Sequence, residues 1–199
     1  MSTSMDMYAE WRSHGQWQFI GRMVKNEFYE AYPDHEMPYL PELLYGSGDD
    51  SLFAILADVD NGILEEKYEY IAPLRGLPDD LSPELKTWFE SSQNKEARAS
   101  WLTLEELITF DWHGKSRKKY AVVDERVAYL FHPERSFPFP EWPQGIRIAY
   151  SITLKEACNA SWTETYVEAA GPDFLELLDT FAKKYGVSNN VRFIFSFSW

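Results

Sequence analysis

The chain has 199 residues, of which 45% are hydrophobic and 17% aromatic. This composition supplies enough apolar material for a folded core and excludes intrinsic disorder, which is poor in aromatic residues. With 32 acidic and 19 basic residues the formal charge is −13, which disfavours direct binding to nucleic acid or to an anionic membrane, because both depend on Lys and Arg neutralising phosphate.

Cys158 is the only cysteine, so no disulfide can form within the chain. The first residues lack the basic and apolar stretches of a signal peptide, and no apolar run approaches the roughly 20 residues that span a bilayer. We therefore expect a single cytoplasmic domain over residues 1–199. Because no histidine lies near Cys158 in the sequence, we expect a buried structural thiol rather than a nucleophile.

The apolar pattern changes period along the chain and predicts both strands and helices. Alternation marks strands, whereas apolar spacings of three and four after a Ser, Thr, Asp or Pro mark helices. The expected strands or extended pieces are 5–12, 17–20, 68–71, 120–123, 127–131, 146–152 and 191–197. The expected helices are 52–59, 83–91, one after Thr103, and 172–185. The expected turns and irregular segments are 13–16, 25–50, 75–80, 93–99, 113–119 and 133–143.

Together these elements predict an α+β fold with a mostly antiparallel sheet, a few packed helices and long loops rich in aromatic residues and proline. The best specified element is the short helix after Thr103. Thr103 and Glu106 have the spacing of a capping box, and Leu102 and Leu107 have that of a hydrophobic staple. Trp101 and Trp112 bracket this helix, which we expect to frame a site.

The sequence contains none of the common catalytic or metal-binding motifs. The four histidines lie far apart, and no zinc, nucleophile-elbow or phosphate-loop pattern occurs. The stretch 58–69 resembles a calcium loop only superficially, since Gly62 stands at the fifth position instead of the sixth. We therefore expect no metal, no cofactor and no catalytic residue, so the protein is more consistent with binding than with catalysis.

Two groups of cations stand out in this acidic chain. The basic run 115–119 is either a solvated loop or an anion contact. The arginines beside apolar strands or turns lie either on a solvent face, which we favour, or in a groove where guanidinium and aromatic groups hold a phosphate and a base. The candidate ligand-binding residues are Arg75, Trp101, Trp112, Lys115, Arg117, Lys118, Arg147 and Arg192.

Three blocks, Leu52–Val59, Arg75–Glu84 and Ser100–Leu107, resemble those of a family of small proteins encoded by bacteriophages and in bacterial genomes. Similar blocks at 163–175 and 191–195 extend the resemblance toward the C-terminus. The chain departs from the family pattern just before the Ser-Trp-Leu block, where family members carry histidines, and at its closing residues. The resemblance carries no catalytic residues. It implies a cytosolic protein that acts by binding.

Three hypotheses for the function follow. The first is a non-enzymatic, phage-type protein that counters host antiviral defence by sequestering a small anionic, nucleotide-like signal in the host cytoplasm. The second is a protein–protein inhibitor of a host defence protein, including an acidic mimic of nucleic acid. The third is an enzyme whose site assembles from distant residues. The surplus of aromatic residues is also compatible with a homo-oligomer.

Overall fold

The computed structural model describes residues 3–34, 37–61, 67–91, 98–148 and 157–198. These residues form two compact units. Unit 1 contains the described residues of 1–63, 67–110 and 173–199. Unit 2 contains the described residues of 111–172. The sequence predicts one domain and no boundary within it.

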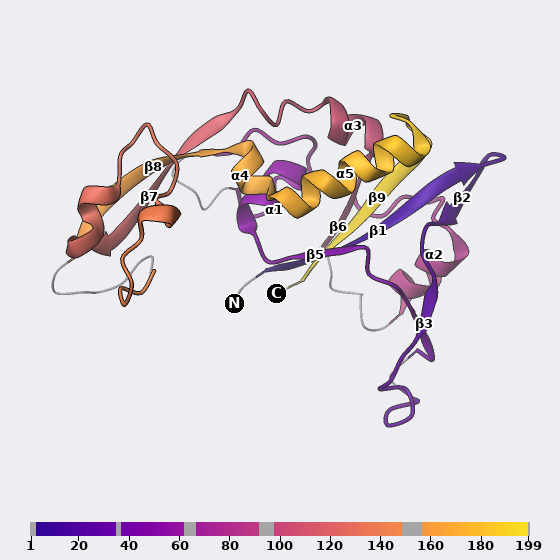
Figure 1. Ribbon diagram of the computed structural model, residues 1–199. Coiled ribbons are helices and arrows are strands. Elements are labelled where there is room, and N and C mark those ends of the chain that lie inside the picture. Colours follow the sequence, from indigo (N-terminus) through magenta and orange to yellow (C-terminus); the bar gives the residue numbers. More distant parts are fainter. Residues whose placement is uncertain (1–2, 35–36, 62–66, 92–97, 149–156, 199) are drawn as a thin grey trace. The chain divides into compact units, whose positions relative to one another are not determined.

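A five-stranded antiparallel sheet forms the centre of unit 1 (Figure 1). Its strands are β1 (Ser4–Ser13), β2 (Gln16–Phe19), β5 (Tyr45–Ser47), β6 (Arg98–Thr103) and β9 (Val191–Ser198). The first and last strands of the chain pair along their length, and β9 also pairs with β6, while β2 and β5 pair with β1. The predicted α+β class with a mostly antiparallel sheet is confirmed.

Helices cover both faces of this sheet. On one face, α1 (Asp50–Ala57) and α5 (Pro172–Tyr185) contribute ring contacts to β9: Phe53 packs against Phe197 and Phe181 against Phe193. On the other face, α2 (Pro83–Glu90) packs Leu85 and Phe89 against Tyr8 and Ile194. Because both faces are covered, β9 is buried from Val191 to Phe197.

Local capping signals placed most of the predicted helices correctly. The capping box of Thr103 and Glu106 is present at the start of α3 (Leu104–Thr109). The two leucines of the predicted hydrophobic staple, Leu102 and Leu107, are buried. The helix predicted at 52–59 is α1, and the carboxylate of its N-cap Asp49 accepts from the Ser51 amide at 2.8 Å. The predicted helices at 83–91 and 172–185 are confirmed as α2 and α5.

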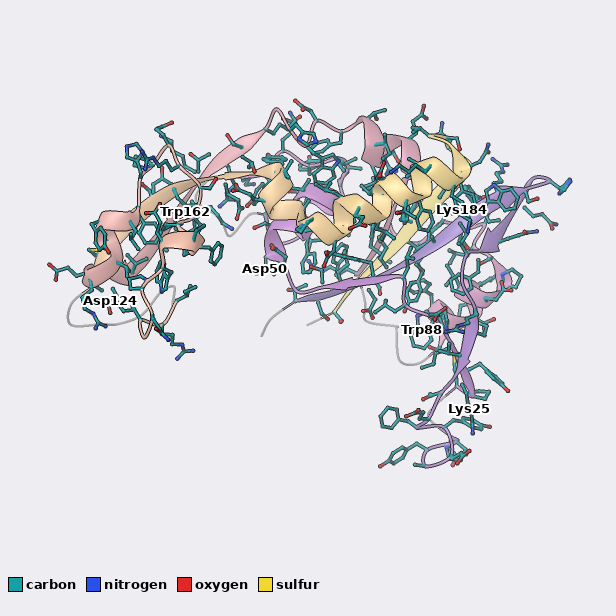
Figure 2. The ribbon with its side chains drawn as sticks, in the orientation of Figure 1. Lys25, Asp50, Trp88, Asp124, Trp162 and Lys184 are labelled. Carbon is teal, nitrogen blue, oxygen red and sulfur yellow. The ribbon has the colours of Figure 1, made fainter. Side chains whose placement is uncertain are left out.

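Unit 2 is built on a two-stranded antiparallel sheet of β7 (Ser116–Asp124) and β8 (Ala157–Thr165). It also holds the 3-10 helices η3 (Glu125–Leu130) and η4 (Phe139–Glu141), and α4 (Tyr166–Ala170), which starts with a second capping box. Phe137, from the loop before η4, packs on this sheet. Its ring centre lies 5.2 Å from the ring centre of Trp162, which is labelled in Figure 2. Cys158 is a free, half-buried thiol beside this core, not a fully buried one.

Several sequence predictions for the elements were wrong. The expected strand 127–131 lies mainly in η3, because the Asp124 carboxylate accepts from the Arg126 amide and caps a tight helical turn. β6 begins at Arg98, inside the segment 93–99 that the sequence predicts as a loop, and the extended piece expected at 68–71 is not part of a strand. Residues 146–148 are not in a strand, and the remainder of the strand predicted at 146–152 lies outside the described residues.

The segment 25–50 is more regular than its proline and glycine content predicts. Besides β5 it contains β4 (Tyr39–Pro41), which pairs with β3 (Met23–Lys25) in a separate hairpin of unit 1 (Figure 1). The basic run 115–119 is also not a loop, since β7 begins at Ser116. In the part of the chain that the structure describes, no helix is long and apolar enough to cross a membrane.

Candidate functional site

The eight candidate ligand-binding residues divide between the two units. Unit 1 holds Arg75, Trp101 and Arg192, and unit 2 holds Trp112, Lys115, Arg117, Lys118 and Arg147. The three in unit 1 come from distant parts of the chain, and the structure brings them together. They belong to a stack of alternating arginine and tryptophan side chains at the end of the sheet.

We call this stack the tryptophan–arginine ladder: Arg12, Trp17, Arg192, Trp101 and Arg75. The guanidinium carbons of Arg12 and Arg192 lie 5.9 and 4.0 Å from the Trp17 ring centre. Those of Arg192 and Arg75 lie 5.8 and 4.8 Å from the Trp101 ring centre. All four distances fall within the range of cation–π attraction.

Strand register places the members of the ladder. Arg12 and Trp17 are directly opposite across β1 and β2, while Arg192 lies opposite both Glu10 of β1 and Thr103 of β6. Side chains alternate along β9, so Arg192 shares the face that α2 covers. The sequence favours the solvent face for Arg192. That prediction was wrong, because Arg192 is 2% exposed.

Carboxylates of the chain neutralise Arg192. Its Nε donates to Glu10 Oε2 at 2.7 Å, and its Nη1 donates to Asp80 Oδ1 at 2.7 Å. Glu10 is fully buried, and its second oxygen accepts from the Ser82 amide at 2.6 Å, just before α2. Asp80 also accepts from Trp17 Nε1 at 2.9 Å. The buried charges are therefore paired and hydrogen-bonded, as charges inside a protein must be.

These contacts change the pKa of the Asp80 carboxyl. Partial burial raises its pKa, but the hydrogen bonds and charge of Arg192, with the bond from Trp17, outweigh this effect and hold the pKa below its ordinary value. Asp80 therefore remains ionised under ordinary conditions and keeps Arg192 paired.

Arg75 closes the outer edge of the sheet. Its Nη1 and Nη2 donate to Glu106 at 3.0 and 2.6 Å, and Nη1 also donates to the Trp101 carbonyl at 3.2 Å. The Gly76 amide donates to the Ala99 carbonyl at 3.1 Å. These bonds satisfy carbonyls on the outer edge of β6, which would otherwise be open to another strand.

Glu106 thus has two roles, since it binds Arg75 and also accepts from the Thr103 amide at 2.8 Å in the capping box of α3. Burial raises the pKa of the Glu106 carboxyl, but the bonds from Arg75 and Thr103 together lower it below its ordinary value. The helix that the sequence singles out is therefore tied to the ladder through a single carboxylate.

The geometry of the ladder favours a structural role over anion binding. The guanidinium groups of Arg75 and Arg192 already donate to carboxylates, so a phosphate would have to displace Glu106 or Asp80. The ladder thus joins strands at the end of the sheet in unit 1, and carboxylates of the chain neutralise Arg75 and Arg192 there.

Three of the predicted cations of unit 2, Lys115, Arg117 and Lys118, lie in β7 or directly before it. Arg117 and Lys118 are in β7, where Lys118 pairs with Glu134 at 3.1 Å, and the neighbouring Lys119 pairs with Glu164 at 3.0 Å. Trp112 is buried, at 5% exposed. The Lys115 carbonyl accepts from the Tyr166 amide, and Arg147 is exposed.

Sequence reasoning missed a surface on the β3–β4 hairpin. Phe28, Tyr32 and Tyr39 are 68%, 58% and 55% exposed, although large aromatic side chains are ordinarily buried in good part. We call these three residues the hairpin surface. Figure 2 labels Lys25, where β3 ends and this loop begins. The signal in the sequence is the density of aromatic residues in the segment 25–50.

A buried asparagine holds the loop of this hairpin in place. Asn26 is 2% exposed, and its Nδ2 donates to the Met37 carbonyl at 2.9 Å while its Oδ1 accepts from the Phe28 amide at 3.0 Å. Its own amide donates to the Pro38 carbonyl at 3.0 Å. One side chain therefore joins both ends of the loop, so the exposed aromatic residues stand on an ordered base.

No protein-family model, curated protein or solved structure matches this chain. The resemblance to small phage and bacterial proteins therefore stays a prediction, and no residue role is carried over from a relative. Among the residues that the structure describes, no group of His, Cys, Asp or Glu side chains is arranged to hold a metal ion.

Proposed function

We propose that this chain acts by binding another protein, and that the hairpin surface is its contact. The observation that carries the proposal is the contrast between the two kinds of candidate residue. Arg75 and Arg192 of the ladder are paired with carboxylates of the chain, whereas the aromatic residues of the hairpin surface are open to solvent. Exposed aromatic side chains on an ordered base are typical of protein contacts.

Sequestration of a nucleotide-like signal is the competing hypothesis. It requires cations that can reach a phosphate, and the two arginines predicted for this role in unit 1, Arg75 and Arg192, are already paired with carboxylates. In unit 2 it would engage β7, where Lys118 is paired with Glu134. Arg192 is buried and paired with two carboxylates, so releasing it for a phosphate would be costly. The exposed aromatic residues therefore make protein binding the better supported function.

The biological setting of the proposal comes from the sequence resemblance alone. Small phage proteins without catalytic motifs often block a host defence protein, so an inhibitor of such a protein in the host cytoplasm is the specific form that we propose. An enzyme with a site assembled from distant residues is the remaining alternative, and no arrangement described above supports it.

Two measurements on the full chain test the proposal. The first is calorimetric titration with a panel of cyclic and ADP-ribose-type nucleotides, which should give no heat. The second is quantitative affinity purification from cells, comparing the wild type with Phe28→Ser/Tyr32→Ser and with Tyr120→Ser/Tyr129→Ser, whose exposed residues lie in unit 2. We expect a stoichiometric protein that only the hairpin variant loses. Nucleotide binding that Arg117→Ala/Lys118→Ala abolishes would instead support sequestration, and nucleotide turnover would support an enzyme.

A further inference from the structure

The hairpin surface also carries an inference about the chemistry of the partner, which rests on the proposed function. Phe28 and Tyr32 lie four residues apart in a turn whose Tyr32 amide donates to the Phe28 carbonyl at 3.1 Å. This spacing brings two side chains to the same side of a helical turn. The turn thus presents a pair of neighbouring rings to solvent.

A turn with outward-facing rings is suited to entering a pocket, not to forming one. Small-molecule sites are concave and bury most of the ligand surface. The ordered base at Asn26 also lowers the entropy that binding would cost, because the loop need not be fixed at the moment of contact. The occupant of this surface is therefore a macromolecule with a recess.

The charge around the rings is negative. The two nearby cations are each engaged, Lys25 with Glu30 at 2.7 Å and Arg22 with Glu42 at 2.8 Å. Glu27 and Asp34, which flank the rings in sequence, are exposed. A carboxylate beside an aromatic face favours lysine or arginine on the opposing surface, since the cation interacts with both.

The same charge argues against two other occupants. Nucleic acid and anionic lipid would be repelled, because the whole chain carries a formal charge of −13. A second copy of the chain would bring the same acidic field to the contact. A basic protein surface is the occupant that the charges favour.

We infer that the hairpin surface docks into an apolar pocket of a partner protein, and that lysine or arginine side chains border this pocket. Phe28 and Tyr32 fill the pocket, while Glu27 and Asp34 face its basic rim. Apolar anchors at the centre and charges at the edge are the usual division of work in protein contacts, with the anchors setting affinity and the charges setting association rate and salt dependence.

A library of displayed folded domains with randomised surface clefts, selected on the immobilised full chain, tests this inference. Enriched domains should line the cleft with aromatic or aliphatic residues and border it with Lys or Arg. Their affinity should fall at least about tenfold in Phe28→Ser/Tyr32→Ser and should not change in the control Tyr120→Ser/Tyr129→Ser. Glu27→Gln/Asp34→Asn should weaken binding less and should reduce its dependence on salt.

Selected domains with acidic or neutral clefts would overturn the basic partner. Selected domains whose affinity does not change in either hairpin variant would overturn the site. The affinity purification described above would still decide whether the chain binds a protein at all. Selection of no domain would also overturn the inference. Circular dichroism of each variant should match the wild type, because every substituted residue is exposed.

Discussion

The guanidinium of Arg192 lies 4.0 Å from the centre of the Trp17 ring, and the indole Nε1 of Trp17 donates to the same Asp80 carboxylate that binds Arg192. Trp17 therefore covers the cation and also helps to hold its counter-ion. The arrangement joins β2, β9 and the turn before α2. It explains how an arginine that is 2% exposed is accommodated at the end of the sheet.

Removal of Arg192 should destabilise the fold strongly. Arg192→Met leaves Glu10 buried without its cation, and breaking such a buried pair costs about 3–5 kcal/mol. Urea denaturation followed by tryptophan fluorescence measures the loss. The matched control is Arg22→Met, because the Arg22–Glu42 pair is exposed and such pairs are worth at most about 1 kcal/mol.

The double variant Glu10→Gln/Arg192→Met distinguishes an unpaired charge from a packing defect. It removes the isolated carboxylate, so it should be more stable than Arg192→Met alone. A double variant that is no more stable than the single one would contradict the role assigned to Glu10.

Glu106→Gln should lower the free energy of unfolding by more than the loss of a helix cap alone would. The substitution weakens the capping box and removes the charge that binds Arg75, and a hydrogen bond to a charged group is worth about 1.5–3 kcal/mol. Glu105→Gln is the matched control, since it removes an exposed charge from the same first turn of α3. It should cost less than about 1 kcal/mol through the helix dipole. Equal losses in urea denaturation would refute the link between Glu106 and Arg75.

Stability should fall in acid partly through Asp80 and Glu106. Their pKa values are lowered in the folded protein from ordinary values of 3.8 and 4.5. A carboxyl with a lowered folded pKa stabilises the fold above its unfolded pKa, and this contribution is lost as the pH falls through that range toward the folded pKa. Urea midpoints between pH 6 and pH 3 should therefore drop less steeply for Asp80→Asn/Glu106→Gln than for the wild type. An unchanged slope would contradict this assignment.

Asn26→Ala should loosen the loop of the β3–β4 hairpin. The substitution removes the bonds to the Met37 carbonyl and the Phe28 amide, so the loop amides should exchange hydrogen faster. Exchange measured by mass spectrometry on peptides covering 27–34 checks this. Asn190→Ala, an exposed position in unit 1, should leave exchange in these peptides as in the wild type, and faster exchange in both variants would argue for a general loss of stability.

Features set by near neighbours in the sequence were predictable. Thr103 and Glu106 are three residues apart, and the hydrogen bonds of their capping box follow from that spacing alone. The alternating Phe193, Phe195 and Phe197 likewise predict one buried face of β9. That alternation says nothing of α2 on the opposite face, which is why Arg192 was expected in solvent.

The candidate site depends on contacts between distant residues, which no local pattern contains. Arg192 meets Glu10 and Asp80 across separations of 182 and 112 residues. The hairpin surface is not predictable from the sequence for a different reason. Aromatic residues such as Phe28 predict burial on average, and their exposure depends on where the loop is held by Asn26.

Hydroxyl-radical footprinting of the complex recovered by affinity purification tests the central claim most directly, since it reports on both sets of exposed rings in one molecule. Our account predicts that oxidation of Phe28, Tyr32 and Tyr39 falls in the complex relative to the free chain, while that of Tyr120, Tyr129 and Phe139 in unit 2 is unchanged. Protection of the unit 2 rings with full oxidation of Phe28 and Tyr32 would contradict it.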